Sequence, residues 1–386
     1  MKIIKNGKII TKENIFIDKV LVFEEKILDI IEEKNLDEYI EKANIANIEV
    51  IDAKGKYVSP GFIDIHVHGC GGSDTMDGTL EDIEIISSNV CKNGVTAFLP
   101  TTMTMEKEKI YEALNVIRKS MGIKNKGAKV VGAHMEGPFI NPRLKGAQNE
   151  KYIEKPDYNF IKEYLDTIKI ITLAPEMDKD YEFIKKVKRD TDIVLSIGHT
   201  NATYEEAMEA IELGVSHGTH TFNAMSPLHH RNPGVVGAIF NSDVTCELIA
   251  DKIHVHPGAF NVLINVKGFN KVVLITDCMR AGNLNEGNYD LGGQKVIVKE
   301  NSARLEDGTL AGSILSLNNG VKNIFKNTNL SLQQVVSMAS INPAKIINME
   351  HKKGSIEIGK DADIVVFDEE FNIKTTIVEG NIVFKA

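Results

Sequence analysis

The sequence predicts an α/β protein: a (β/α)8 TIM barrel with a small β-sandwich domain built from both termini. Two observations lead to this prediction. In the middle of the chain, strand-like segments alternate with amphipathic helical segments, eight strands over roughly 280 residues. At both ends, short strand-like segments follow one another through tight turns. We therefore expect residues 1–57 plus 352–386 to form the sandwich and residues 58–351 to form the barrel.

Both ends of the chain consist of short strand-like segments separated by turns. The strands expected there are 2–4, 8–10, 20–23, 363–367, 373–378 and 382–384. An Asn6-Gly7 dipeptide separates the first two, as in a tight hairpin turn. Because chain termini often lie close together, one joint sandwich is preferred over two unrelated β appendages.

The middle of the chain contains the strands of the expected barrel. They are 62–68, 95–100, 129–134, 168–173, 192–199, 217–222, 245–250 and 272–277. A capping box at Thr203 opens a helix that stops at Gly214, and Ser331 opens another that ends before Pro343. The alternative is an open doubly wound sheet, but no Gly-x-Gly-x-x-Gly turn follows the first strand.

Composition limits the function classes. A hydrophobic fraction of 42% and a charged fraction of 26% are typical of a soluble globular protein. The net charge of −9 argues against a nucleic-acid partner, which would need a basic face, while an anionic small molecule could still find a local basic pocket.

The cysteines and the apolar segments indicate a cytoplasmic protein. The four cysteines (Cys70, Cys91, Cys246 and Cys278) include no Cys-x-x-Cys pair, which is typical of reduced thiols. The first residues lack the apolar run of a signal peptide, and no stretch approaches the ~18 apolar residues of a membrane span. We expect no membrane partner.

Metal-ligand side chains stand at or just past the ends of six expected strands. On the first strand, alternation places Asp64, His66 and His68 on one face. The groups at the other strand ends are Glu136, His199, His220, His254 and Asp277. Barrel enzymes build their sites on this rim, so the groups should converge. Nitrogen and carboxylate ligands without sulfur suit Zn, Fe, Mn or Co.

Several motifs connect these groups to a known family. They are Pro-Gly-Phe-Ile-Asp-Ile-His-Val-His-Gly at 60–69, His-Met-Glu-Gly-Pro-Phe at 134–139, Gly-His-Thr at 198–200, Thr-His-Thr-Phe-Asn-Ala-Met at 219–225, Ile-Ala-Asp-Lys-Ile-His-Val-His-Pro at 249–257, Thr-Asp at 276–277 and Leu-Ala-Gly-Ser at 310–313. Over essentially its full length the chain resembles the amidohydrolase superfamily and, within it, the N-acetylglucosamine-6-phosphate deacetylases. The resemblance implies hydrolysis of the acetamide of this amino-sugar phosphate.

The resemblance also implies the metal ligands. Glu136, His199 and His220 would hold one divalent metal, and His66 and His68 would help to hold a second, together with Asp277 and a bridging Glu136. Other amidohydrolases bridge two metals with a carboxylated lysine on the fourth strand, and no lysine ends that strand here. One or two metals per subunit are expected, and two are preferred because both histidines of the first strand are present.

Two further residues are assigned catalytic roles by the resemblance. Asp277 would move a proton from the attacking water to the departing amine. His254 would donate a hydrogen bond to the acetyl carbonyl oxygen as negative charge builds there. The alternatives are a plain metal ligand or helix cap for Asp277, and a phosphate or hydroxyl contact or simple packing for His254.

Other residues match family positions that bind the substrate. Arg231, in a basic turn at 229–234, offers a planar fork to phosphate beside Asn223 and the backbone N–H of Ala224. In the family this arginine comes from the neighbouring subunit, so a homodimer is implied; a solvated loop is the alternative. The remaining matches are Ala147, Leu310, Ala311, Gly312 and Ser313, whereas Gln148 stands where some relatives carry His.

Two other functions compete with the deacetylase. A cyclic-amide hydrolase of the dihydropyrimidinase or dihydroorotase kind would need the missing fourth-strand lysine and has no use for Arg231 with Asn223. A catalytically dead barrel acting as a scaffold would be expected to lose ligands, and all are present.

Overall fold

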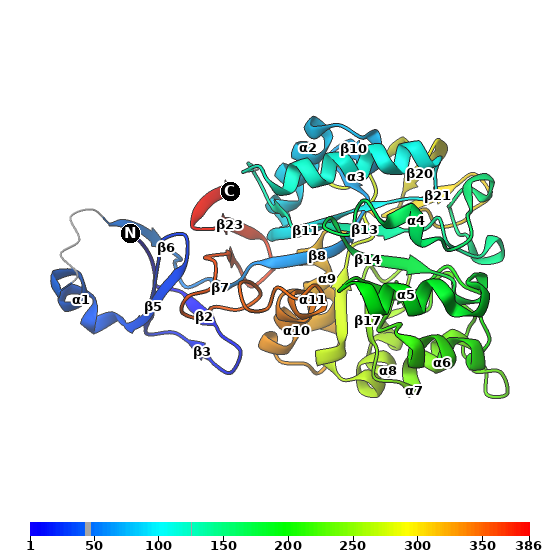
Figure 1. Cartoon of the computed structure of the whole chain (residues 1–386). Helices are drawn as coiled ribbons and strands as arrows, with labels where there is room; N and C mark the ends of the chain where they lie inside the picture. The colour runs from blue at the N-terminus through cyan, green and yellow to red at the C-terminus, as the bar shows by residue number, and fades with distance from the viewer. Residues whose placement is uncertain (43–47, 125) are drawn as a thin grey trace.

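Segments from both ends of the chain build one β-sandwich, in a computed structural model that describes residues 1–42, 48–124 and 126–386 (Figure 1). The first sheet has the order β5-β4-β1-β6, and the second has the order β24-β23-β22-β7-β2-β3. The strands of the first are β1 (Lys2–Lys5), β4 (Lys19–Phe23), β5 (Ile27–Glu32) and β6 (Glu49–Asp52). Those of the second are β2 (Lys8–Ile10), β3 (Ile15–Phe16), β7 (Tyr57–Pro60), β22 (Ile364–Phe367), β23 (Ile373–Val378) and β24 (Asn381–Lys385).

The joint sandwich expected from the sequence is confirmed by strand pairing and by a shared core. The C-terminal strand β22 pairs antiparallel with the N-terminal strand β7, with Val366 opposite Val58. Buried side chains of both sheets, among them Phe23 and Ile364, belong to one apolar cluster. Helix α1 (Leu36–Lys42) lies at the outer end of the sandwich (Figure 1). The exact domain boundaries, 1–57 plus 352–386 and 58–351, stay a prediction.

The barrel consists of parallel strands in chain order. They are β8 (Phe62–Val67), β11 (Val95–Thr102), β12 (Lys129–Val130), β13 (Ala133–Glu136), β14 (Ile168–Leu173), β15 (Val194–Ile197), β16 (His217–Gly218), β17 (Thr245–Ile249) and β18 (Val272–Ile275). With β12 and β13 as two halves of one interrupted strand, these are the eight predicted strands. The backbone N–H of Asp277 donates to the carbonyl of His66 at 2.9 Å, which joins the last strand end to the first. The predicted TIM barrel is therefore confirmed.

Two predicted strands differ from the observed ones. The segment 129–134 is interrupted at Gly132, whose φ of +148° favours glycine and breaks the ladder between β12 and β13. The segment 217–222 is a strand only over β16, because His220 and Phe222 adopt positive φ angles of 30° and 81°. The chain therefore leaves the sheet early and turns across the rim of the barrel.

Helices cover the outside of the barrel (Figure 1). They are α2 (Leu80–Val90), α3 (Lys107–Met121), α4 (Tyr158–Ile161), α5 (Glu182–Asp190), α6 (Tyr204–Leu213), α7 (Gly234–Asn241), α8 (Pro257–Lys267), α9 (Leu317–Asn327), α10 (Leu332–Met338) and α11 (Ile341–Ile346). The predicted capping boxes at Thr203 and Ser331 are both present, before α6 and α10. Pro343 lies in the first turn of α11, where a missing N–H is tolerated. None of the described helices is long and apolar enough to cross a membrane.

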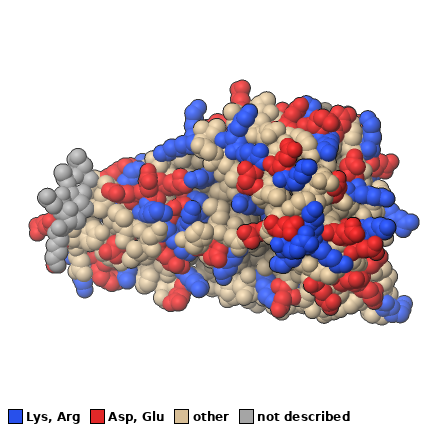
Figure 2. Space-filling model, in the orientation of Figure 1, with Lys and Arg blue, Asp and Glu red and all other residues tan. Residues whose placement is uncertain are grey.

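A three-stranded antiparallel sheet follows β18 and was not anticipated from the sequence. It consists of β19 (Gly287–Leu291), β20 (Gln294–Lys299) and β21 (Ser302–Leu305). The side-chain amide of Gln294 donates to the carbonyl of Ala147, which ties this sheet to the loop after β13. Two shorter strands, β9 (Gly69–Cys70) and β10 (Ser73–Asp74), form a hairpin after β8. On the molecular surface, acidic and basic side chains are interspersed over the visible face (Figure 2).

A buried lysine pairs with two carboxylates of the C-terminal segment that joins the sandwich. The Nζ atom of Lys353 lies 2.7 Å from Asp363 Oδ2 and 3.0 Å from Asp361 Oδ2, and its side chain is only 1% exposed. Burial alone would lower the pKa of Lys353, but the two carboxylates raise it above its ordinary value. Removing this cation would leave the buried Asp363 without its cationic partner, whereas Asp361 would keep Lys26 at 2.9 Å.

Lys353→Met should therefore lower the free energy of unfolding by about 3–5 kcal/mol, which is the cost of breaking a buried ion pair from one side. Lys322→Met is the matched control, because Lys322 pairs with the exposed Glu370 and should cost at most about 1 kcal/mol. Urea unfolding followed by circular dichroism measures both variants. Equal losses would show that the buried ion pairs of Lys353 do not stabilise the fold more than an exposed pair does.

Candidate metal centre and active site

The predicted site residues converge on a cavity of about 240 Å³ at the C-terminal ends of the barrel strands. The predicted residues that line it are His68, Ala147, Glu136, His199, His220, Asn223, Ala224, His254, Asp277, Leu310 and Gly312. They come from segments dispersed over more than half of the chain. The barrel topology brings them together, because parallel strands deliver all their C-terminal ends to one rim.

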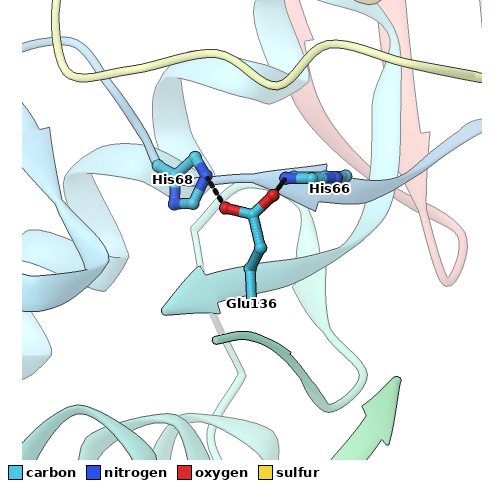
Figure 3. A group of neighbouring side chains, drawn as sticks. All are labelled: His66, His68 and Glu136. Atoms are coloured by element: carbon cyan, nitrogen blue, oxygen red, sulfur yellow. Dashed lines mark ion pairs between the residues drawn. The ribbon is translucent and has the colours of Figure 1, made fainter. Parts of the chain in front are cut away.

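The carboxylate of Glu136, at the end of β13, is the centre of the cluster. Its Oε1 lies 3.3 Å from His66 Nε2, and its Oε2 lies 3.3 Å from His68 Nε2. Figure 3 shows the imidazoles of His66, on β8, and of His68, just after it, approaching the two carboxylate oxygens, one each. The side chain of Glu136 is 3% exposed, so these contacts are made away from bulk water.

Two more imidazoles approach the same carboxylate from the other side of the rim. The Nε2 atoms of His199 and His220 lie 3.2 Å and 3.0 Å from Glu136 Oε1. These two nitrogens are also only 3.1 Å from each other. Glu136 is thus the shared member of two groups of three ligand atoms, one with His66 and His68 and one with His199 and His220.

The second ring nitrogen of each histidine fixes its tautomer. In all four rings Nδ1 contacts an oxygen: Glu247 Oε2 at 2.9 Å from His66, Thr101 O at 3.2 Å from His68, Leu144 O at 2.9 Å from His199 and Asn223 O at 3.1 Å from His220. Carbonyl and carboxylate oxygens accept hydrogen bonds, so Nδ1 must carry the proton. In the neutral rings, Nε2 therefore presents a lone pair toward Glu136, as metal-binding histidines do.

This arrangement fits a divalent cation. Two Nε2 lone pairs facing each other at 3.1 Å in His199 and His220 repel unless a positive charge lies between them. The Nε2 of His66 is fully buried and has no hydrogen-bond partner in the described part of the chain. A donor set of imidazole nitrogens and one shared carboxylate suits Zn, Fe, Mn or Co.

The electrostatics of the cluster also favour a cation. Burial would lower the pKa of His66 and His68, but the carboxylates of Glu136, Asp277 and Glu247 outweigh it, and the pKa of His68 rises to about 10. Burial likewise raises the pKa of Glu136, yet the surrounding imidazoles bring it well below its usual range. The local field therefore stabilises positive charge here, and a metal would replace the protons that otherwise supply it.

Backbone strain is concentrated at the same residues. His199, His220 and Asp277 have positive φ angles of 48°, 30° and 49°, a region that costs non-glycine residues free energy. At Asp277 the strained conformation is held from both sides, since its N–H donates to His66 O and its C=O accepts the N–H of Ser313 at 2.7 Å. The strain turns these side chains from the strand ends into the cavity.

Asp277 and His254 both line the cavity. Asp277 Oδ1 lies 3.4 Å from His68 Nε2 and 3.6 Å from His66 Nε2. Burial raises the pKa of Asp277, but His66 and His68 lower it overall, so the group is a carboxylate at neutral pH. His254 lines the cavity, and its Nδ1 lies 2.6 Å from Asp251 Oδ2, which fixes the ring plane.

Three predicted substrate residues lie outside the cavity wall. Ala311 and Ser313 are buried behind the rim, where their N–H groups donate to Ala303 O and Asp277 O. Ser313 therefore supports Asp277 rather than facing the cavity. Arg231 is exposed beside His230 and does not line the cavity of its own chain, and its role toward a neighbouring subunit stays a prediction.

Several contributing residues were given no role on the basis of the sequence. Gln148 donates from Nε2 to Glu136 Oε2 at 2.7 Å, and its Oε1 accepts the N–H of Thr104 at 2.6 Å, which fixes the orientation of the amide. Glu247 is a single carboxylate in the otherwise uncharged strand β17, and a charged residue in such a strand could have indicated a role in the site. Asp251, three residues before His254, could likewise have been recognised as a partner of that histidine.

The chain matches a protein family, characterised proteins of similar sequence and solved structures of similar fold. The amidohydrolase family matches residues 57–383. N-acetylglucosamine-6-phosphate deacetylase of Bacillus subtilis (strain 168) is 43% identical over 333 residues, which cover 84% of this chain and 84% of that protein. The crystal structure of N-acetylglucosamine-6-phosphate deacetylase from Pasteurella multocida covers 99% of both chains with a TM-score of 0.91 and 32% identity. A mutant of the Mycobacterium smegmatis enzyme in complex with N-acetyl-D-glucosamine-6-phosphate covers 100% of this chain and 99% of its own, with a TM-score of 0.90 and 25% identity.

Proposed function

Because the chain belongs to the amidohydrolase family, we propose that it hydrolyses the acetamide of N-acetyl-D-glucosamine 6-phosphate to D-glucosamine 6-phosphate and acetate. The observation that carries this proposal is the cluster of four imidazoles around Glu136, with Asp277 beside it in a cavity at the barrel rim. Water adds to the acetyl carbonyl carbon, the C–N bond breaks, and the amine leaves with a proton.

We propose that two divalent metals are held per subunit. Glu136 Oε1 with His199 and His220 forms the first metal group, and Glu136 with His66 and His68 forms the second metal group. When bound, such ions supply Lewis-acid activation of water and of the carbonyl at neutral pH. The donor set is compatible with Zn, Fe, Mn or Co, and it does not select among them.

Asp277 is the proposed proton carrier. As a carboxylate beside His66 and His68, it can accept a proton from the attacking water on Oδ1. It can then donate that proton to the amine nitrogen as the C–N bond breaks. This return is essential, because an unprotonated amide nitrogen is a poor leaving group.

His254 is the proposed donor to the acetyl oxygen. Asp251 Oδ2 accepts from Nδ1 of His254, and this bond persists when the ring also carries a proton on Nε2. In that form Nε2–H can donate to the carbonyl oxygen where negative charge develops. Asp251 therefore acts through His254, by holding its orientation and balancing its charge.

The phosphate of the substrate would lie against Asn223 and the backbone N–H of Ala224, two residues that line the cavity. The exposed Arg231 would complete this pocket in the neighbouring subunit of a homodimer, as the family resemblance implies. We place the enzyme in the cytoplasm, where phosphorylated sugars are metabolised and where its four free cysteines would stay reduced.

Arg231→Ala should lower kcat/KM for the phosphorylated sugar by about 10–100-fold, because a charge-assisted hydrogen bond to phosphate contributes roughly 1.5–3 kcal/mol. Free N-acetylglucosamine should be affected little, since it has no group for Arg231 to bind. Arg189→Ala, on α5 in an exposed pair with Asp190, is the control and should leave both rates unchanged. Equal losses on both sugars would remove the phosphate assignment.

The direct test of the proposed function is acetate release by the metal-loaded protein. We expect rapid release from N-acetylglucosamine 6-phosphate and slow release from N-acetylglucosamine. Hydrolysis of a dihydropyrimidine or dihydroorotate in preference to the amino sugar would contradict the proposal.

A further inference from the structure

Another buried carboxylate lies beside the metal ligands and does not line the cavity. Glu247, in the middle of β17, is 0% exposed, and the mechanism above does not use it. A carboxylate in such a position is costly unless it is paired, so its partners indicate what it does.

One oxygen of Glu247 contacts both metal groups. Oε2 accepts the Nδ1–H of His66 at 2.9 Å and the backbone N–H of His220 at 3.0 Å. His66 belongs to the second metal group and His220 to the first. The backbone carbonyl of Glu247 also accepts the N–H of Thr221, which fixes the residue next to His220.

The other carboxylate oxygen of Glu247, Oε1, makes weaker contacts. Oε1 lies 3.4 Å from His217 Nε2, and neither atom has a hydrogen-bond partner among the described residues. Nδ1 of His217 is 2.7 Å from Thr245 Oγ1. The contacts of Glu247 are therefore strongest on the side of the metal ligands.

The bond to His66 differs from those of the other ligand histidines. His68, His199 and His220 each direct Nδ1 to a backbone carbonyl, whereas His66 directs it to a full negative charge. A carboxylate partner locks the tautomer and makes the opposite ring nitrogen a stronger donor to a metal. The same oxygen also holds the backbone of His220 in its strained conformation, with φ of 30°.

Glu247 is not a ligand of a third ion with His134, although the two lie near each other with His66. Both ring nitrogens of His134 are already used, since Nδ1 lies 2.9 Å from Ile65 O and Nε2 lies 2.7 Å from Thr172 Oγ1. His134 therefore has no lone pair to offer a metal.

We propose that Glu247 is a positioning residue that sets the affinity of the second metal group through His66. The proposal rests on the two-metal function above. It predicts that loss of the charge at Glu247 weakens one metal far more than the other. Glu247 contacts only one of the three ligands of the first metal group, and it does so through the backbone N–H of His220. The affinity of that group for its metal should therefore fall much less.

The test is a Co²⁺ titration of the metal-free full-length protein, followed by visible absorption and by competition with a chelator. In Glu247→Gln we expect one Co²⁺ to bind as in the wild type and the other to bind about 10–100-fold more weakly, the usual range for loss of such a partner. His217→Gln is the matched control, because it changes the other neighbour of Glu247 and leaves the bond to His66 intact. That variant should bind both ions as the wild type does.

Glu247→Asp keeps the charge but shortens the side chain, and it should give an intermediate loss at the same metal. It provides the test if the glutamine variant does not fold, as judged by circular dichroism. Wild-type binding of both ions, or equal weakening of both, in the folded variants would overturn the proposal, as would a wild type that binds a single ion. The titration needs no substrate, so failure of acetate release in the wild type would contradict the proposed function separately.

Discussion

Asp277→Asn should reduce turnover by about 10²–10⁴-fold, the range that a positioned general acid–base supplies. Asparagine has nearly the same shape as aspartate, but its amide cannot accept the proton of the attacking water. The loss should fall on kcat, because substrate binding depends mainly on other residues of the cavity. Metal content should remain nearly unchanged, because Asp277 Oδ1 lies no closer than 3.4 Å to His66 and His68, which have Glu136 as well.

Steady-state kinetics and metal analysis of the same preparation would check this prediction. Asp178→Asn is the matched control: Asp178 is a buried carboxylate that accepts N–H groups at the start of α5, away from the cavity. It should keep its activity. Wild-type turnover in Asp277→Asn would reject the role of proton carrier, and loss of metal with activity would make Asp277 a plain ligand instead.

Glu136→Gln should remove metal from both groups and with it at least about 10³-fold in activity, since the metal contributes several kcal/mol to the transition state. All four ligand imidazoles lie within 3.0–3.3 Å of this one carboxylate. A neutral amide donates fewer electrons to a cation, and its NH₂ group would face an Nε2 lone pair or the metal. Loss of one charge therefore affects two sites at once.

Gln148→Ala gives the comparison that isolates this effect. It removes the hydrogen bond to Glu136 Oε2 and the acceptor of the Thr104 N–H, but it leaves the charge of Glu136, so activity and metal affinity should fall by about tenfold. Metal analysis with acetate-release kinetics measures both variants. Two retained metals in Glu136→Gln would show that Glu136 is not the bridge.

The fold could be predicted because its signals are local. Each barrel strand is a short apolar segment between turns or caps, and the alternation of strands with helices limits the topology to a few choices. The prediction was wrong where the chain leaves a strand early, as after Gly218, because the positive φ angles of the following residues are not visible in the sequence. The sheet formed by β19, β20 and β21 was missed for a different reason, since it is an insertion in a barrel connection.

The site residues that could be predicted are those whose position follows from barrel topology alone. His199 and His220 follow their strands directly, and position at a strand end was enough to place them. Alternation along β8 correctly predicted that Asp64 lies on the same face as His66. It did not predict that Asp64 lies beneath the site, where its Oδ2 accepts a hydrogen bond from Thr276 Oγ1 at 2.6 Å. Burial raises the pKa of Asp64 to about 7 despite that bond. The supporting role of Glu247 depends on a contact with His66 across the barrel, and no local pattern encodes such a contact.

The most direct test of the account is metal analysis of the purified protein combined with acetate release from N-acetylglucosamine 6-phosphate, before and after treatment with a chelator. We predict two divalent ions per subunit, loss of acetate release when they are removed, and recovery when Zn²⁺, Fe²⁺, Mn²⁺ or Co²⁺ is returned. Undiminished acetate release from protein shown to be free of metal would contradict the account, because the imidazoles around Glu136 would then have no part in the reaction.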